Sequence, residues 1–273
     1  MKTPVRFSDR CVGRRTLLQA MAVALLVPTW QTAHAQLALS TAINRTARFR
    51  ALSQRMAKAY CQIYLNVLPD QARAVLVSAR KLVQLGFADL AKVQWPEDLT
   101  LQLAQIEKLA QDLDALLAQP PSKTSVAAVS LQADKMLASA DSTTLTLEKL
   151  AQTNTARLVS TAGRQRMLSQ RLAKNYSLAA AGLTSPKLTD QMISDTIEFK
   201  QALVILGAAP VSSPGIRSEL ALGESQWVFF DAALQRQPDE RGLQAVATTS
   251  ERLLEVMDKV TGLYDMALKE ELG

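Results

Sequence analysis

Histidine and cysteine are the residues that this sequence most lacks. Its 273 residues include one histidine, His34, and two cysteines, Cys11 and Cys61. His34 and Cys11 fall within a predicted export signal, residues 1–35, so the mature chain keeps only Cys61. That excludes an intrachain disulfide, a His/Cys zinc site, c-type haem attachment and a histidine-based catalytic triad. We interpret Cys61 as a small apolar core residue and expect neither a metal site nor a cofactor.

Motifs of catalysis and of membrane spanning are also missing. The sequence contains no carboxylate pair with clear spacing, no nucleophile–base pair and no glycine-rich phosphate loop. No apolar run reaches the ~20 residues that cross a bilayer as a helix. We therefore expect a non-enzymatic protein without a transmembrane helix.

The N-terminus has the pattern of an export signal. Five basic residues precede a short apolar stretch from Thr16 to Val27, and Ala33-His34-Ala35 is a cleavage site of the A-x-A type. The pair Arg14-Arg15 favours the twin-arginine route, with an ordinary Sec signal as the alternative. Cleavage after Ala35 predicts a periplasmic protein.

The net charge of the whole chain overstates that of the mature protein, because the predicted export signal is rich in basic residues. The net charge is +6, but the predicted signal holds 5 of the 31 basic residues and 1 of the 25 acidic ones. The remaining 238 residues carry a net charge of +2, so nucleic-acid binding loses its main support. A chain of this length suits two domains of about 115 residues each.

Proline punctuates a chain that otherwise has helical patterns throughout. We predict an all-α protein of two antiparallel four-helix bundles, residues 36–152 and 153–273, each with short loops. One helix of the second bundle is expected to bury the run Trp227–Phe230. The expected helices are 37–68, 70–93, 97–119, 124–151, 155–181, 187–206, 216–236 and 242–272.

A sequence repeat supports the tandem arrangement. Residues 46–60 (TARFRALSQRMAKAY) and 162–176 (AGRQRMLSQRLAKNY) align without a gap at an offset of 116, and 9 of 15 positions are identical. At 100° per residue, both copies have one large apolar face and one opposite face of small residues around a single arginine. We expect the small face to pack closely against another helix. The residues of this face that we select as ligand candidates are Arg50, Arg166, Gly163, Ala47, Gln54 and Gln170.

The motif of the second copy, Ala162-Gly-Arg-Gln-Arg-Met-Leu-Ser-Gln-Arg-Leu-Ala-Lys174, resembles the periplasmic sensor domain of NarX-type nitrate/nitrite sensor kinases and PilJ-type chemotaxis transducers. That resemblance implies a four-helix bundle in which nitrate lies between the paired first helices of two subunits, held by arginine. The ligand arginine falls on Arg166 and, through the repeat, on Arg50; the nearby glycine falls on Gly163, where the first copy has Ala47. Gln54 and Gln170 could add hydrogen bonds to a ligand or across the helix contact.

The junction of the two copies leaves two architectures open. From Thr124 to Ala162 there is neither proline nor glycine, which favours a continuous helix and bundles stacked end to end. Each arginine face would then need a second chain, and the protein would be a homodimer. A turn at Asn154 would instead place the bundles side by side within one chain.

Two functions stay open on these grounds. One is a periplasmic binding protein for a small oxyanion, nitrate or nitrite, that passes its signal to a membrane kinase or transducer. Its physical basis is that a planar guanidinium pairs bidentately with oxyanions. The alternative is a helical module that docks onto such a membrane partner without binding a small molecule.

Overall fold

The protein is entirely helical over residues 29–272, the part that the computed structural model describes, with side chains from residue 38 onward. Its eight helices are α1 (Thr29–Tyr64), α2 (Pro69–Leu90), α3 (Glu97–Leu117), α4 (Lys123–Ala151), α5 (Asn154–Ala180), α6 (Pro186–Ala208), α7 (Pro214–Leu234) and α8 (Glu240–Leu272). The predicted fold class is therefore confirmed at the level of an all-helical protein.

Capping residues explain several helix starts. The side chains of Ser122, Thr153, Ser185 and Ser213 each accept a hydrogen bond from a backbone N–H in the first turn of the helix that follows. Such bonds satisfy donors that a helix cannot pair internally. Proline occupies the first turn of α2, α6 and α7, where its missing N–H costs nothing.

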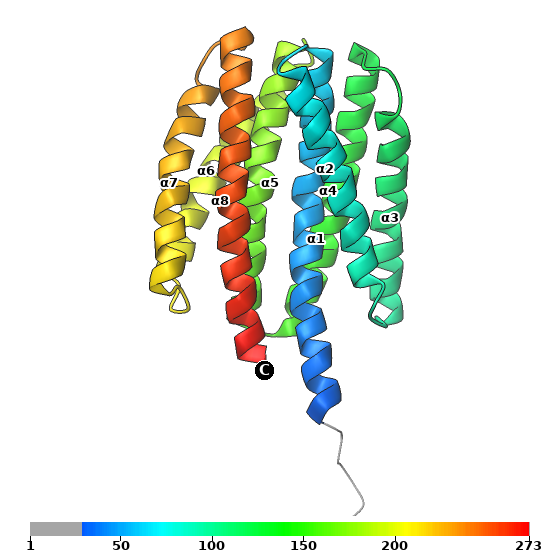
Figure 1. Ribbon diagram of the computed structural model, residues 1–273, viewed down its shortest axis with the longest axis vertical. Helices are drawn as coiled ribbons and strands as arrows, with labels where there is room; N and C mark the ends of the chain where they lie inside the picture. The colour runs from blue at the N-terminus through cyan, green and yellow to red at the C-terminus, as the bar shows by residue number, and fades with distance from the viewer. Residues whose placement is uncertain (1–28, 273) are drawn as a thin grey trace, which may run out of the picture.

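The helices form two sets, which we call the first half (α1–α4) and the second half (α5–α8). In the first half, α1 packs against α2 and α4, and α3 packs against α4; in the second, α5 packs against α6 and α8, and α7 against α8. The halves lie side by side and meet mainly along α1 and α5, which both begin at the same end of the molecule and run in the same direction (Figure 1).

The continuous helix favoured from the sequence is wrong. Helix α4 ends at Ala151, Gln152 adopts a left-handed conformation with φ of 54°, and Thr153 caps α5. The chain reverses here, at the position where the sequence offered only a weak break. This reversal brings α1 and α5 together within one chain, so the arginine faces need no second subunit.

The predicted export signal lies mostly outside the described residues, which begin at Thr29. Its proposed cleavage site, residues 33–35, falls inside α1. The signal and its twin-arginine route stay predictions. Among the helices of residues 29–272, none has the length and apolarity needed to cross a bilayer.

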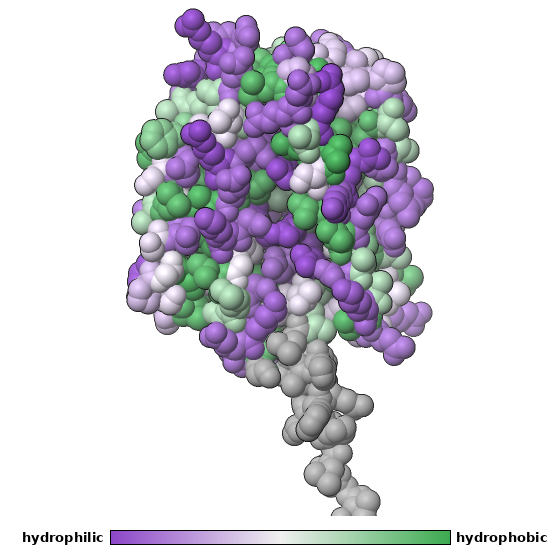
Figure 2. Space-filling view, viewed as in Figure 1, coloured by the Kyte–Doolittle hydropathy of each residue, from purple (hydrophilic) through white to green (hydrophobic). Residues whose placement is uncertain are grey.

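The predicted core run in α7 is only half correct. Trp227 and Phe230 are buried, but Val228 and Phe229 are more than 60% exposed. At 100° per residue, neighbours in sequence point about 100° apart, so four consecutive helical residues cannot share one buried face. Hydrophobic residues also form small patches among hydrophilic ones on the face viewed in Figure 2.

Phe230 and Phe229 provide a matched test of this core. Phe230→Ala removes a side chain with no exposure and is expected to lower the free energy of unfolding by about 3–5 kcal/mol. Phe229→Ala, one position away, should change it by only about 0.5 kcal/mol. Urea denaturation of both variants measures the difference, and similar losses would show that the face of α7 is misassigned.

Candidate functional site

The candidate site is the seam between α1 and α5, where Ala47 and Gly163 lie against each other. A Cβ placed on Gly163 would lie 2.9 Å from the Cβ of Ala47. It would also lie 3.2 Å from Nη2 of Arg166 and 3.5 Å from Nη2 of Arg50. Because these residues correspond in the repeat, the two arginines approach one point from opposite sides. They are 116 positions apart in the sequence, and the fold brings them together.

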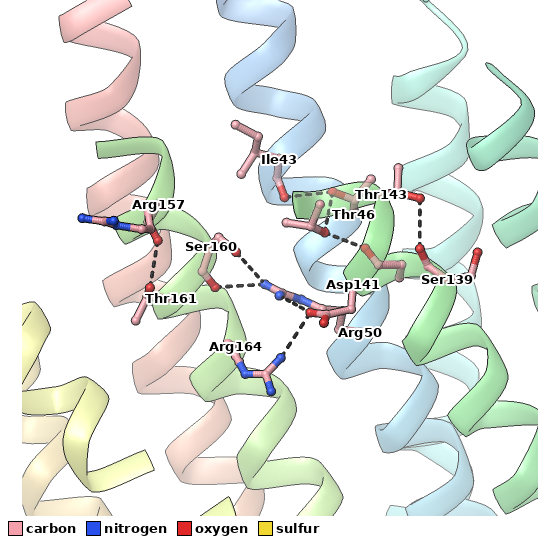
Figure 3. A network of polar contacts seen from close by, with 12 residues as sticks. Ile43, Thr46, Arg50, Ser139, Asp141, Thr143, Arg157, Ser160, Thr161 and Arg164 are labelled. Carbon is pink, nitrogen blue, oxygen red and sulfur yellow. Dashed lines mark hydrogen bonds and ion pairs between the residues drawn. The ribbon is translucent and has the colours of Figure 1, made fainter. Parts of the chain in front are cut away.

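Arg50 crosses the seam from the first half to the second (Figure 3). Its Nη2 donates to the backbone oxygen of Ser160 at 2.9 Å and to Oγ of the same residue at 3.3 Å. Its Nη1 donates to Oδ1 of Asp141 on α4 at 2.7 Å, where Nη1 of Arg164 also arrives at 3.2 Å. A carboxylate of α4 is thus shared by two arginines, one from each half.

Arg166 makes the corresponding contacts in the opposite direction. Its Nη1 donates to Oδ1 of Asp258 on α8 at 2.6 Å, and its Nη2 donates to Oδ1 of Asn44 on α1 at 3.2 Å. Arg48 of α1 also donates to Asp258. Asn44 and Ser160 differ by 116 residues, as Arg50 and Arg166 do, so the seam has an approximate two-fold symmetry.

Burial dominates the electrostatics of both arginines. Each side chain is 1% exposed. Burial lowers the pKa of Arg166 to about 10 and also lowers that of Arg50, with Asp258 and Asp141 opposing the shifts. Because arginine is not deprotonated in proteins, both guanidiniums are charged near neutral pH. Removing one aspartate would leave a buried cation without its partner, which is strongly destabilising.

Two buried lysines tie the halves together further along the seam. Lys58 of α1 pairs with Glu251 of α8, and Lys174 of α5 pairs with Asp134 of α4 at 2.6 Å. Burial lowers the pKa of both lysines, and the carboxylates oppose that effect. These lysines occupy equal positions in the two copies, and that correspondence was the signal from which their shared role could have been predicted.

The remaining candidates have structural contacts in the described part of the chain. The side-chain amide of Gln54 donates to the backbone oxygen of Ala133 at 3.3 Å, and that of Gln170 donates to the oxygen of Ser250 at 3.0 Å. These bonds connect α1 with α4 and α5 with α8. Cys61 is fully buried, and burial raises the pKa of its thiol to about 12, which agrees with its interpretation as a core residue.

The arginines at the edges of the seam pair with acidic residues on neighbouring helices. Their partners are Asp258 for Arg48, Glu251 for Arg55, Glu198 and Asp141 for Arg164, and Asp195 for Arg171. Unexpectedly, Asp141 and Asp258 also neutralise the two central arginines. A second repeat offset could have identified them as a corresponding pair. These aspartates differ by 117 positions, which is the offset at which the sequence of α4 matches that of α8.

A polar cavity of about 440 Å³ adjoins the seam between α4, α5 and α6. Two of its wall residues, Asp141 and Arg164, belong to the network around Arg50. Its walls contain four basic and two acidic side chains: Arg164, Arg171, Lys174, Lys187, Asp134 and Asp141. Within residues 29–272 there is no cluster of His, Cys, Asp and Glu that could hold a metal ion.

The close contact at Gly163 predicts opposite effects for one substitution at two glycines. Gly163→Ala forces a methyl group against Ala47 and should lower the free energy of unfolding by about 1–3 kcal/mol. Gly207→Ala meets no atom within 4 Å and should stabilise α6 by up to about 1 kcal/mol. Urea denaturation distinguishes them.

The double variant Ala47→Gly/Gly163→Ala tests the pairing directly. It moves the methyl group to the other side of the seam and should recover much of the stability lost in Gly163→Ala. A double variant no more stable than the single one would contradict direct packing of these two positions.

We expect the ion pairs of Glu251 to make a pH-dependent contribution to the free energy of unfolding. Burial alone would raise its pKa, but the charges and hydrogen bonds of Lys58 and Arg55 outweigh burial and lower the pKa to about 2. A lowered pKa means that the contribution, roughly 3 kcal/mol, is complete above about pH 5 and is lost as pH falls toward about 2. The deficit of Glu251→Gln relative to wild type should therefore shrink between about pH 7 and pH 2.5 in urea denaturation. A deficit independent of pH would contradict the ion pair.

Comparison with known protein families gives a match to part of this chain. The family described as type IV pili methyl-accepting chemotaxis transducer N-term, PilJ, matches residues 150–227. No curated protein and no solved structure matches the chain. The matched segment covers α5, α6 and most of α7 and includes Gly163, Arg166 and Gln170. This segment is therefore similar to the N-terminal domain of PilJ-type chemotaxis transducers.

Proposed function

We propose that this protein is a non-enzymatic, extracytoplasmic signalling module of the PilJ type. Its halves are two tandem antiparallel four-helix bundles, residues 36–152 and 153–273, and the seam between α1 and α5 is where a signal enters. The similarity of residues 150–227 to the PilJ family supports the signalling role. Domains of that family are typically periplasmic and work with signalling partners in chemotaxis.

The observation that carries the proposal is the meeting of Arg50 and Arg166 beside Gly163. Two like charges converge in a region closed to water, and each is balanced by an aspartate of its own half. Anything that competes for these guanidiniums changes the balance between α1, α4, α5 and α8. A seam of this kind has discrete arrangements whose populations a ligand can shift.

We assign a small oxyanion, nitrate or nitrite, as the competing ligand. Within the described residues, Nε of Arg50 and Nε of Arg166 are both buried without a hydrogen-bond partner. A planar anion could use such a donor together with a neighbouring Nη. The adjoining cavity is lined by Asp141 and Arg164, which belong to the network around Arg50, so an anion that entered it would lie close to that network.

Arg166→Lys tests this assignment because it keeps the charge but removes the planar fork. Nitrate or nitrite at millimolar concentration should raise the melting temperature of the wild type by several degrees, relative to chloride at equal ionic strength. The shift should disappear in Arg166→Lys. It should persist in Arg80→Lys, where an arginine–aspartate pair with Asp114 joins α2 to α3 away from the seam.

Absence of any shift in the wild type at about 10 mM anion would refute the oxyanion assignment. The docking alternative would then remain. It is favoured by exposed apolar residues on one side of α6, Ile193, Ile197 and Val204, which are more than 50% exposed and lie within about 40° on the helix. That side would contact a membrane kinase or transducer.

A further inference from the structure

A large cavity in the first half has no role in the seam. It measures about 1050 Å³ and lies between α2 and α3, with Val83, Phe87, Leu103 and Ala110 in its walls. Neither Arg50 nor Arg166 lines it. Its size is that of a site for a small organic molecule, which in proteins usually occupies several hundred Å³ of mainly apolar space.

The second half shows which kind of group fits this space. The buried positions of α2 recur in α6 at an offset of 116, and those of α3 recur in α7 at 117. By these offsets Val83 corresponds to Phe199, and Ala110 corresponds to Trp227. The buried pairs that support the alignment are Ala79 with Asp195, Leu90 with Leu206, Leu99 with Ile216, Leu103 with Leu220, and Leu113 with Phe230.

Phe199 and Trp227 fill the corresponding space with stacked rings. Their ring centroids are 4.2 Å apart, and the rings are inclined by only 17°. The first half has Val83 and Ala110 at these positions, and a cavity lies between α2 and α3 instead of the rings. Protein interiors are close-packed, and walls that face a void lose the dispersion contacts that a neighbour would supply.

The open cavity retains aromatic walls. Phe87 lines it and stacks on Phe49, with ring centroids 4.4 Å apart. Trp95 also lines it, and its indole N–H donates to the backbone oxygen of Leu90 at 2.9 Å, which fixes the ring. Flat rings stack favourably on such walls in offset or edge-to-face geometry.

Three charged residues line the cavity, and two of them neutralise each other, which favours an uncharged ligand; the third, Glu107, is exposed. Arg80 and Asp114 both line it, but they are engaged with each other, with Nη2 of Arg80 2.7 Å from Oδ2 of Asp114. Gln84 and Gln111 add amide groups that can donate to or accept from a neutral polar atom.

We propose that the cavity between α2 and α3 binds a small neutral aromatic molecule, with a fused or single ring and one hydrogen-bonding group. The ring would occupy the volume that Phe199 and Trp227 fill in the second half. This inference rests on the proposed correspondence of the two halves and is independent of the oxyanion assignment.

Indole serves as the probe, and isothermal titration calorimetry on the full chain measures its binding. The wild type should bind indole with a dissociation constant in the micromolar to low-millimolar range. Val83→Phe/Ala110→Trp installs the second half's residues and should weaken binding roughly tenfold or more. Cyclohexanol, which has a hydrogen-bonding group on a ring that is not aromatic, should bind more weakly than indole.

Val77→Phe/Ala115→Trp is the matched control. It makes equivalent enlargements on the same two helices at exposed positions that do not line the cavity, and it should leave indole binding unchanged. If Val83→Phe/Ala110→Trp fails to fold by circular dichroism, Ala104→Trp, at an exposed position in the cavity wall, takes its place.

Three results would overturn the proposal: no indole binding by the wild type up to about 5 mM, equal affinity in the wild type and the filled variant, or tighter binding of cyclohexanol than of indole. Arg166→Lys should bind indole as the wild type does. A failure of the oxyanion assignment is therefore distinguishable from a failure here.

Discussion

The pairing of buried arginines with carboxylates is the constraint on which the rest of this structure depends. A guanidinium that is 1% exposed is costly unless its charge is balanced and its N–H groups find acceptors. Asp141 and Asp258 balance Arg50 and Arg166, and acceptors on the opposite half take further N–H groups. The halves therefore cannot slide or separate without exposing these charges or leaving them unpaired.

This constraint also explains the residue types along the seam. Two helices that pack this closely need small residues at their contact, and Ala47 and Gly163 are such residues. A Cβ on Gly163 would lie only 2.9 Å from the Cβ of Ala47. The lysine pairs with Glu251 and Asp134 repeat the same design further along the seam, each joining one half to the other. Buried ion pairs often contribute specificity of arrangement rather than net stability. We infer that here they set the register of α1 against α5.

The sequence predicted the helices, and the position of the central arginines at a helix contact, better than it predicted how the halves are joined. Periodicity and proline positions were sufficient for the helices because both act within a few residues, and the opposed faces of the repeat identified Arg50 and Arg166. The reversal at Gln152 was only the less favoured alternative, a turn at Asn154, because it uses a left-handed residue without glycine or proline. The contacts between α1 and α5 that accompany it join residues far apart in the sequence. The acidic partners were missed because Asp141 and Asp258 follow their arginines by 91 and 92 positions. Nothing within their own helices distinguishes them from solvent-exposed acids.

The two halves differ in the packing of their outer helices. Close to the seam, Arg50 and Arg166 donate to corresponding residues of the opposite half, and Gln54 and Gln170 donate to corresponding backbone oxygens. Between the outer helices, the second half has a stacked Phe199–Trp227 pair and the first has an open cavity. A filled bundle resists rearrangement because displacing its rings sacrifices close packing, whereas an open one lacks those contacts. The first half is therefore the half whose packing a bound molecule can change, and α1 is the helix through which such a change would reach the seam.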